Sequence, residues 1–163
     1  MRLSFRIKHH FFNAFRELFV HHHGSLEFRA KIFALIIASD EKSKVDNYIL
    51  VKAYGLKIYN NDEERANLLM LTTKELVQKV KDRNGLDIDT LVTNIQKELK
   101  IVPRYAKKID IDSLQPLLHL THDKDIICYQ ERIVDFLKSL KEETLHTQKF
   151  QIDADEKNLK RNS

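Results

Sequence analysis

Several side chains that can bind a metal ion are close together in the sequence near residue 120. His119 and His122 are three residues apart, so they share one face if this segment is helical. Asp123, Asp125 and Cys128 follow within the next six residues. Neutral imidazole and carboxylate groups suit zinc or another divalent ion, which needs three or four converging ligands. The residue types therefore indicate a candidate metal site.

The predicted metal ligands are Asp40, His119, His122 and Asp123, with Asp40 joining from a distant turn. A simpler interpretation competes with this one, namely a histidine at a helix end followed by a solvated acidic turn. Two histidines three residues apart, with no general-base Glu beside them, are a weak signal for a zinc enzyme. Cys128 either forms a thiolate pair with His122 or packs as a small apolar side chain, and we favour packing.

Five further histidines occur near the N-terminus, as His9-His10 and as the run from His21 to His23. Consecutive helical residues point 100° apart, so three adjacent histidines cannot bind one ion from a helix. Gly24 follows as a typical signal for a helix C-terminus, where a charged histidine is favoured by the helix dipole. We therefore interpret the run as the end of a helix.

Residues 2–22 show a helical pattern with a broad apolar face that is rich in phenylalanine. Residues 1–31 hold six basic and two acidic side chains, so the whole net charge of +4 lies in this segment. Three roles are open for this helix: it packs on the core or on a second copy of the chain, it lies on an anionic membrane, or it binds nucleic acid. We favour packing, and the sequence contains no recognised motif for binding nucleic acid. The residues expected to contact a partner or a membrane are Arg2, Arg6, Phe11, Phe12, Phe15, Arg16 and Phe19.

The remaining sequence divides into helices joined by short polar turns. The periodicity predicts helices over residues 26–39, 45–59, 61–81, 87–99, 112–120 and 126–142. Asn61 and Glu64 have capping-box spacing. The helix over residues 87–99 is expected to be capped by Asp87 or Asp89, and the helix over residues 112–120 by Asp112. The chain has only three glycines and two prolines, and we find no convincing strand. We therefore predict an all-α bundle of six to seven helices, with residues 143–163 as a polar, flexible tail.

Two parts of this bundle resemble each other. Residues 34–42 and 117–125 each combine an apolar helix with an acidic turn, and Asp40 aligns with Asp123. Each unit is followed by a second amphipathic helix. The pattern predicts two helical hairpins related by a pseudo-twofold axis, which bury each other's apolar faces.

The turns of the two units read Ala38-Ser39-Asp40-Glu41 and Thr121-His122-Asp123-Lys124. This double unit of apolar helix, acidic turn and helix resembles the TerB-like family, over about residues 26–141, although both copies lack the glycine of the family's usual Ala-Asp-Gly turn. The resemblance implies the all-helical fold of tellurite-resistance proteins and of some J-domain co-chaperones, with metal binding through the turn acids. The chain has no His-Pro-Asp motif, so the co-chaperone role is not expected.

We expect a basic amphipathic helix over residues 1–24, a TerB-like domain over residues 25–142 and the tail over residues 143–163. A single cysteine fits a reducing compartment, and no apolar run reaches the roughly 18 residues that span a bilayer. We also find no signal peptide, phosphate-binding loop, nucleophile elbow or dinucleotide-binding glycine pattern.

These observations favour a non-enzymatic cytoplasmic interaction or scaffold module that needs no cofactor. Its partner is expected to be a protein or a second copy of the chain, with an anionic membrane surface as a further candidate for the N-terminal helix. The first alternative is a divalent-metal-binding stress-response domain, and the second is an uncharacterised enzyme.

Overall fold

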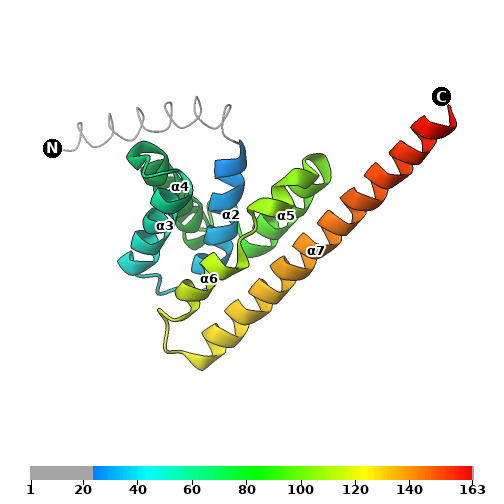
Figure 1. Cartoon of the computed structure of the whole chain (residues 1–163). Helices are drawn as coiled ribbons and strands as arrows, with labels where there is room; N and C mark the ends of the chain where they lie inside the picture. The colour runs from blue at the N-terminus through cyan, green and yellow to red at the C-terminus, as the bar shows by residue number, and fades with distance from the viewer. Residues whose placement is uncertain (1–23, 163) are drawn as a thin grey trace.

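The computed structural model of the chain describes residues 24–162, which form α-helices and one 3-10 helix without any strand. The predicted all-α fold is therefore confirmed. The elements in chain order are α2 (Gly24–Ala38), α3 (Val45–Ile58), α4 (Glu63–Lys81), α5 (Ile88–Ile101), the 3-10 helix η1 (Pro103–Lys108), α6 (Ile111–Leu118) and α7 (Lys124–Arg161) (Figure 1).

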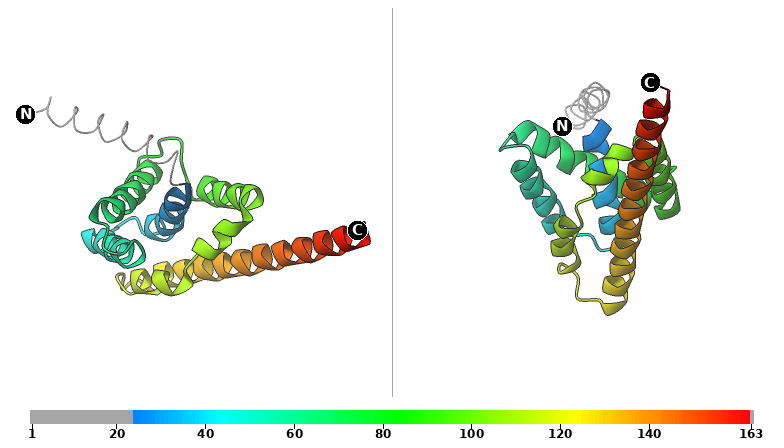
Figure 2. Two further views of the ribbon diagram at one scale, coloured as in Figure 1. Left: turned by 45° about the horizontal axis from the view of Figure 1, so that its top comes forward. Right: turned by 45° about the vertical axis from the view of Figure 1, so that its right-hand side comes forward.

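Helix α2 is the centre of the bundle. Its sequence is apolar on nearly all sides, which is typical of a helix that is buried all round. It packs against α4, α5, η1, α6 and α7, and Figures 1 and 2 show it enclosed by these elements. Phe28, Leu35 and Ile36 are completely buried. Lys31 extends from α2 to Glu98 of α5, with 3.1 Å between Nζ and Oε2.

Helices α3 and α4 cross closely at Gly55. A Cβ atom at this position would lie 2.9 Å from the Cα atom of Ala66, a distance that real contacts essentially never reach. Two small residues therefore allow the two backbones to approach, and Gly55 is needed for its lack of a side chain rather than for its backbone angles.

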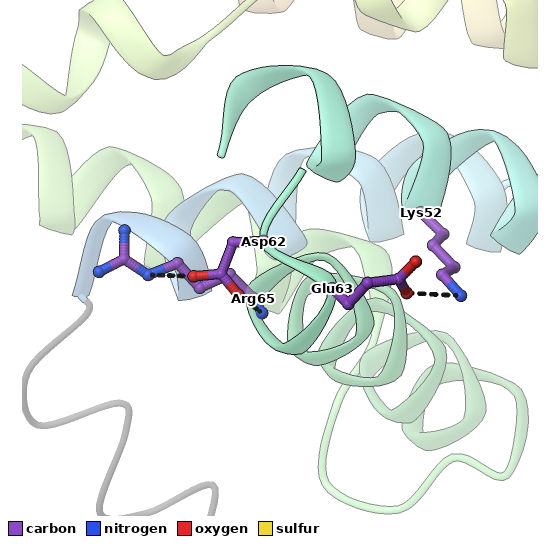
Figure 3. Close-up of polar contacts among 4 residues, drawn as sticks. All are labelled: Lys52, Asp62, Glu63 and Arg65. Carbon is purple, nitrogen blue, oxygen red and sulfur yellow. Dashed lines mark hydrogen bonds and ion pairs between the residues drawn. The ribbon is translucent and has the colours of Figure 1, made fainter. Parts of the chain in front are cut away.

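Helix α4 begins one residue later than the capping-box spacing predicts. Asp62 is the N-cap and accepts a hydrogen bond from the backbone N–H of Arg65 at 3.1 Å, whereas Asn61 adopts a left-handed φ of 62° before it. Figure 3 shows two ion pairs here, Arg65–Asp62 at 3.5 Å and Lys52–Glu63 at 3.4 Å. These side chains are largely exposed, so the pairs contribute little to stability.

The next three α-helices, α5, α6 and α7, also begin at aspartate side chains. Asp87 caps α5 by accepting from the Thr90 N–H at 2.7 Å, and Asp123 caps α7. Asp110 caps α6, so the prediction of Asp112 as its cap is wrong. Asp112 lies in the first helical turn instead, where a negative charge still interacts favourably with the helix dipole.

Helix α7 is 38 residues long and continues to Arg161, so its predicted end near residue 142 is wrong. The segment beyond residue 142 is polar but contains no glycine or proline, and helix formation does not require an apolar face. The basic side chains of Lys160 and Arg161 in the last turn suit the helix dipole. Its buried residues Gln130, Ile133, Val134 and Leu137 all lie in the first half, and every residue from 149 to 162 is exposed.

The described residues include no helix with the length and apolar character needed to cross a membrane. The predicted N-terminal helix lies outside the described residues. The pseudo-twofold relation between the two hairpins stays a prediction, as does the division into three domains.

Candidate functional site

The four predicted metal ligands are dispersed over turns and helix ends. Asp40 follows α2 and accepts a hydrogen bond from the backbone N–H of Lys42 at 2.9 Å. Asp123 caps α7 through the backbone N–H groups of Asp125 and Ile126, at 3.0 and 3.4 Å. The two carboxylates thus organise local backbone, which is the simpler of the two interpretations considered for the acidic turns.

His119 is the C-cap residue of α6, and His122 lies in the exposed turn before α7. Within residues 24–162, no group of three or more His, Cys, Asp or Glu side chains is placed to hold a metal ion. The structure therefore does not bring the predicted ligands together. Cys128 is exposed, so the expectation that it packs as an apolar group is wrong.

The seven residues predicted to bind a partner or a membrane, from Arg2 to Phe19, lie outside the described residues. Their role stays a prediction.

A chain of hydrogen bonds joins three elements on the bundle side of α3. Arg29 of α2 donates to the hydroxyl oxygen of Tyr54 at 2.9 Å, and that hydroxyl donates to Oδ2 of Asp110 at 3.2 Å. Burial, opposed by the positive charge of Arg29 and reinforced by the negative charge of Asp110, raises the pKa of Tyr54 to about 12. The phenol is consequently protonated at neutral pH, so it acts as a structural link rather than as a base.

The most unusual feature of the described chain is the second half of α7, residues 146–161, which we call the outer half of α7. Figures 1 and 2 show it extending well past the other helices. It carries exposed apolar side chains: Phe150 is 69% exposed, Ile152 51% and Leu159 71%. Single apolar residues on a surface are common, but their arrangement on this helix is ordered.

Leu145, Ile152 and Leu159 recur every seven residues and form one line along α7, which we call the α7 stripe. An α-helix turns about 100° per residue, so seven residues return to the same side with a drift of only about 20°. Leu145 is half-buried against the core, so the α7 stripe begins at the bundle and continues outward. Phe150 is two residues from Ile152 and lies on the opposite side.

A groove of about 680 Å³ lies beside the stripe, between α7 and the end of α5 with the start of η1. Its apolar lining comes from Leu99, Pro103, Leu140 and Ile152. Glutamine, threonine and charged side chains complete the lining. The groove and the stripe share Ile152, so a docked helix or peptide that covers the stripe would also border the groove.

Sequence reasoning missed this surface because residues 143–163 were interpreted as a tail. The seven-residue spacing was present in the sequence, but only three apolar residues carry it, and most of the residues between them are polar. Comparisons of the chain with protein-family models, curated proteins and solved structures find no match.

Proposed function

We propose that this chain is a non-enzymatic interaction module in which a helical bundle presents the outer half of α7 to a protein partner. The observation that carries the proposal is the exposed line of apolar side chains on a helix that leaves its own bundle. Complete burial of an isoleucine or leucine side chain is worth about 1.5–3 kcal/mol. A partner helix that covers the stripe would gain part of this free energy at Ile152 and Leu159, whereas Leu145 is already half-buried against its own bundle.

The first half of α7 is anchored in a way that supports this role. The side chain of Gln130 donates from Nε2 to the carbonyl oxygen of Ile36 at 3.1 Å, and it is only 3% exposed. Lys141 donates from Nζ to the carbonyl oxygen of Ile109 at 2.7 Å, near the point where α7 leaves the bundle. The two contacts fix the direction of the helix, so a docking partner would not have to order it.

The proposal is tested by placing a photoreactive amino acid at Ile152 in the full chain and mapping the adducts formed in the producing cell. The matched control places the same group at Phe150, which is also exposed but lies on the opposite side of α7. A defined protein adduct from Ile152 and none from Phe150 is expected. Equal labelling from both positions, or none from Ile152, would contradict a docking role for the stripe.

A chain that ends at residue 146 provides a second test. The core residues all precede this point. We therefore expect the shortened chain to keep its cooperative thermal unfolding and to lose its binding to the protein partner. Loss of the folded bundle would show instead that the outer half of α7 serves stability.

A further inference from the structure

We propose that the partner of the outer half of α7 is a second copy of this chain, paired antiparallel along the α7 stripe and centred on Ile152. This inference rests on the proposed function and adds the identity of the partner and the geometry of the contact. It is carried by the pattern of charges beside the stripe, which is complementary to itself.

The charges lie along one flank of the stripe. At about 100° per residue, one side of the line through Leu145, Ile152 and Leu159 carries five charged residues: Glu142, Lys149, Asp153, Glu156 and Lys160. Lys149 and Glu156 lie closest to the line, and Asp153 lies farthest from it. The opposite flank carries Gln148 and Asp155 and borders the groove. Along the helix this side reads negative, positive, negative, negative and positive, with a positive charge before Ile152 and a negative charge after it next to the stripe.

A twofold axis at Ile152 brings opposite charges together. In an antiparallel pair, Leu145 lies opposite Leu159 of the second copy, and Ile152 lies opposite itself. The same operation places Glu142 near Lys160 of the second copy, and Lys149 near Glu156. Because a twofold contact is reciprocal, each of these two pairs occurs twice.

A parallel pair in register would have the reverse effect. It would place the charged flank of one copy against the opposite flank of the second copy, so that Lys149 would lie near Gln148 and Glu156 near Asp155, a like charge. Like-charge juxtaposition disfavours an arrangement, and such patterns select partner and orientation in helix pairs. The charges therefore favour the antiparallel arrangement.

The free length of α7 fits this pairing. The overlap runs from residue 142 to residue 160, which is about 27 Å of helix at 1.5 Å per residue. It begins just after Lys141, where α7 still bonds to Ile109 of its own bundle, and ends in the last turn before Arg161. The two bundles then lie at opposite ends of the helix pair, and Phe150 of each copy faces away from the contact.

A contact of two helices over this length is smaller than a standard protein–protein interface. Small interfaces are typical of reversible, transient association. We therefore expect a monomer–dimer equilibrium that depends on concentration rather than an obligate dimer.

Sedimentation velocity of the full chain over a wide range of concentration tests the inference. The unmodified chain should shift from monomer to dimer. Ile152→Glu should weaken the dimer by about tenfold or more, because it buries a charge at the symmetry axis. Phe150→Glu is the matched control, an apolar-to-acidic change on the opposite side, and should leave the equilibrium unchanged. Far-ultraviolet circular dichroism confirms that each variant is folded.

Charge reversal tests the orientation. Lys149→Glu alone should weaken the dimer, and combining it with Glu156→Lys should restore it, because the exchanged charges attract again across the twofold axis. A monomer at every concentration, association that ignores Ile152→Glu, or failure of the double variant to recover would overturn the inference.

The photoreactive group at Ile152 separates failure of this inference from failure of the proposed function. An adduct between two copies of this chain supports the antiparallel dimer. An adduct with a different protein overturns the dimer while the docking role of the stripe stands. An absence of any adduct from Ile152 overturns both.

Discussion

Gln130 holds α7 on the central helix, and its surroundings allow a quantitative prediction. Its Nε2 donates to the carbonyl oxygen of Ile36 at 3.1 Å, but its Oε1 is buried with no hydrogen-bond partner among the described residues. The Ile36 oxygen also accepts a hydrogen bond from the Ser39 hydroxyl at 2.5 Å. Replacing Gln130 with methionine would keep nearly the same volume and remove one satisfied and one unsatisfied polar group.

The two effects oppose each other. Losing the hydrogen bond costs about 0.5–1.5 kcal/mol, whereas removing a buried unsatisfied acceptor gains about 1–3 kcal/mol. Ile36 keeps its bond to Ser39, so no new unsatisfied carbonyl arises. We therefore expect Gln130→Met to change the free energy of unfolding by about −0.5 to +2.5 kcal/mol, where a positive value favours the folded chain.

Gln130→Glu is the contrasting variant. Burial raises the pKa of a carboxyl group, so the folded-state pKa of this Glu should lie above its unfolded value of about 4.3. A group of this kind binds its proton more tightly in the folded chain. The variant should therefore resemble the unmodified chain below pH about 4 and lose stability as the pH rises above that value, by about 1.4 kcal/mol for each unit of pKa difference.

Urea unfolding followed by circular dichroism, at several pH values, measures both variants. A loss of more than about 1 kcal/mol in Gln130→Met would refute the reasoning, because it would show that the hydrogen bond outweighs the unsatisfied oxygen. A stability of Gln130→Glu that does not fall with rising pH would show that the site is not buried in solution.

Three further predictions concern the bundle. Tyr54→Phe should lower the free energy of unfolding by about 1 kcal/mol in urea titrations, because Arg29 and Asp110 lose their shared partner. The folded pKa of Tyr54 is raised from 10.0 to about 12, so the stability that its hydroxyl contributes is present below pH 10 and is lost as the pH rises toward 12. Tyr54→Phe should not show this loss of stability at alkaline pH. Hydrogen bonds from Thr90 lower the pKa of Asp87, so its stabilising effect is present at neutral pH and disappears as the pH falls through its folded pKa; Asp87→Ala should destabilise the chain at neutral pH but not in acid, and an equal loss in acid would contradict this. Gly55→Val should cost about 1–3 kcal/mol in thermal unfolding, because its side chain meets the α4 backbone, and unchanged stability would show that the two helices separate easily.

The sequence predicted the helices well because long apolar or periodic segments alternate with short polar turns, and glycine and proline are scarce. The all-apolar run from Ile32 to Ile37 indicated a buried helix, and this run is the centre of the core. Boundaries were less accurate where several polar residues compete for the same role. Asn61 and Asp62 are both good N-caps, and only the backbone angles, with Asn61 in the left-handed region, show that Asp62 is used.

The candidate site was harder to predict than the fold. The spacing of His119, His122 and Asp123 suggested a metal, but ligands must converge in space, and distances between helix ends cannot be read from spacing alone. The extent of α7 was missed because polarity was interpreted as loss of helix. A helix could have been inferred from the seven-residue spacing of Leu145, Ile152 and Leu159, together with the absence of glycine and proline from residues 143–163.

Hydrogen–deuterium exchange of the outer half of α7 tests the central claim most directly. An exposed helical segment with few buried contacts opens easily, and its backbone amides exchange quickly unless a partner covers it. We predict that the amides of residues 146–161 become more protected as the concentration of the full chain rises, and that Ile152→Glu abolishes this protection while Phe150→Glu retains it. Protection that is independent of concentration, or that persists in Ile152→Glu, would contradict the account.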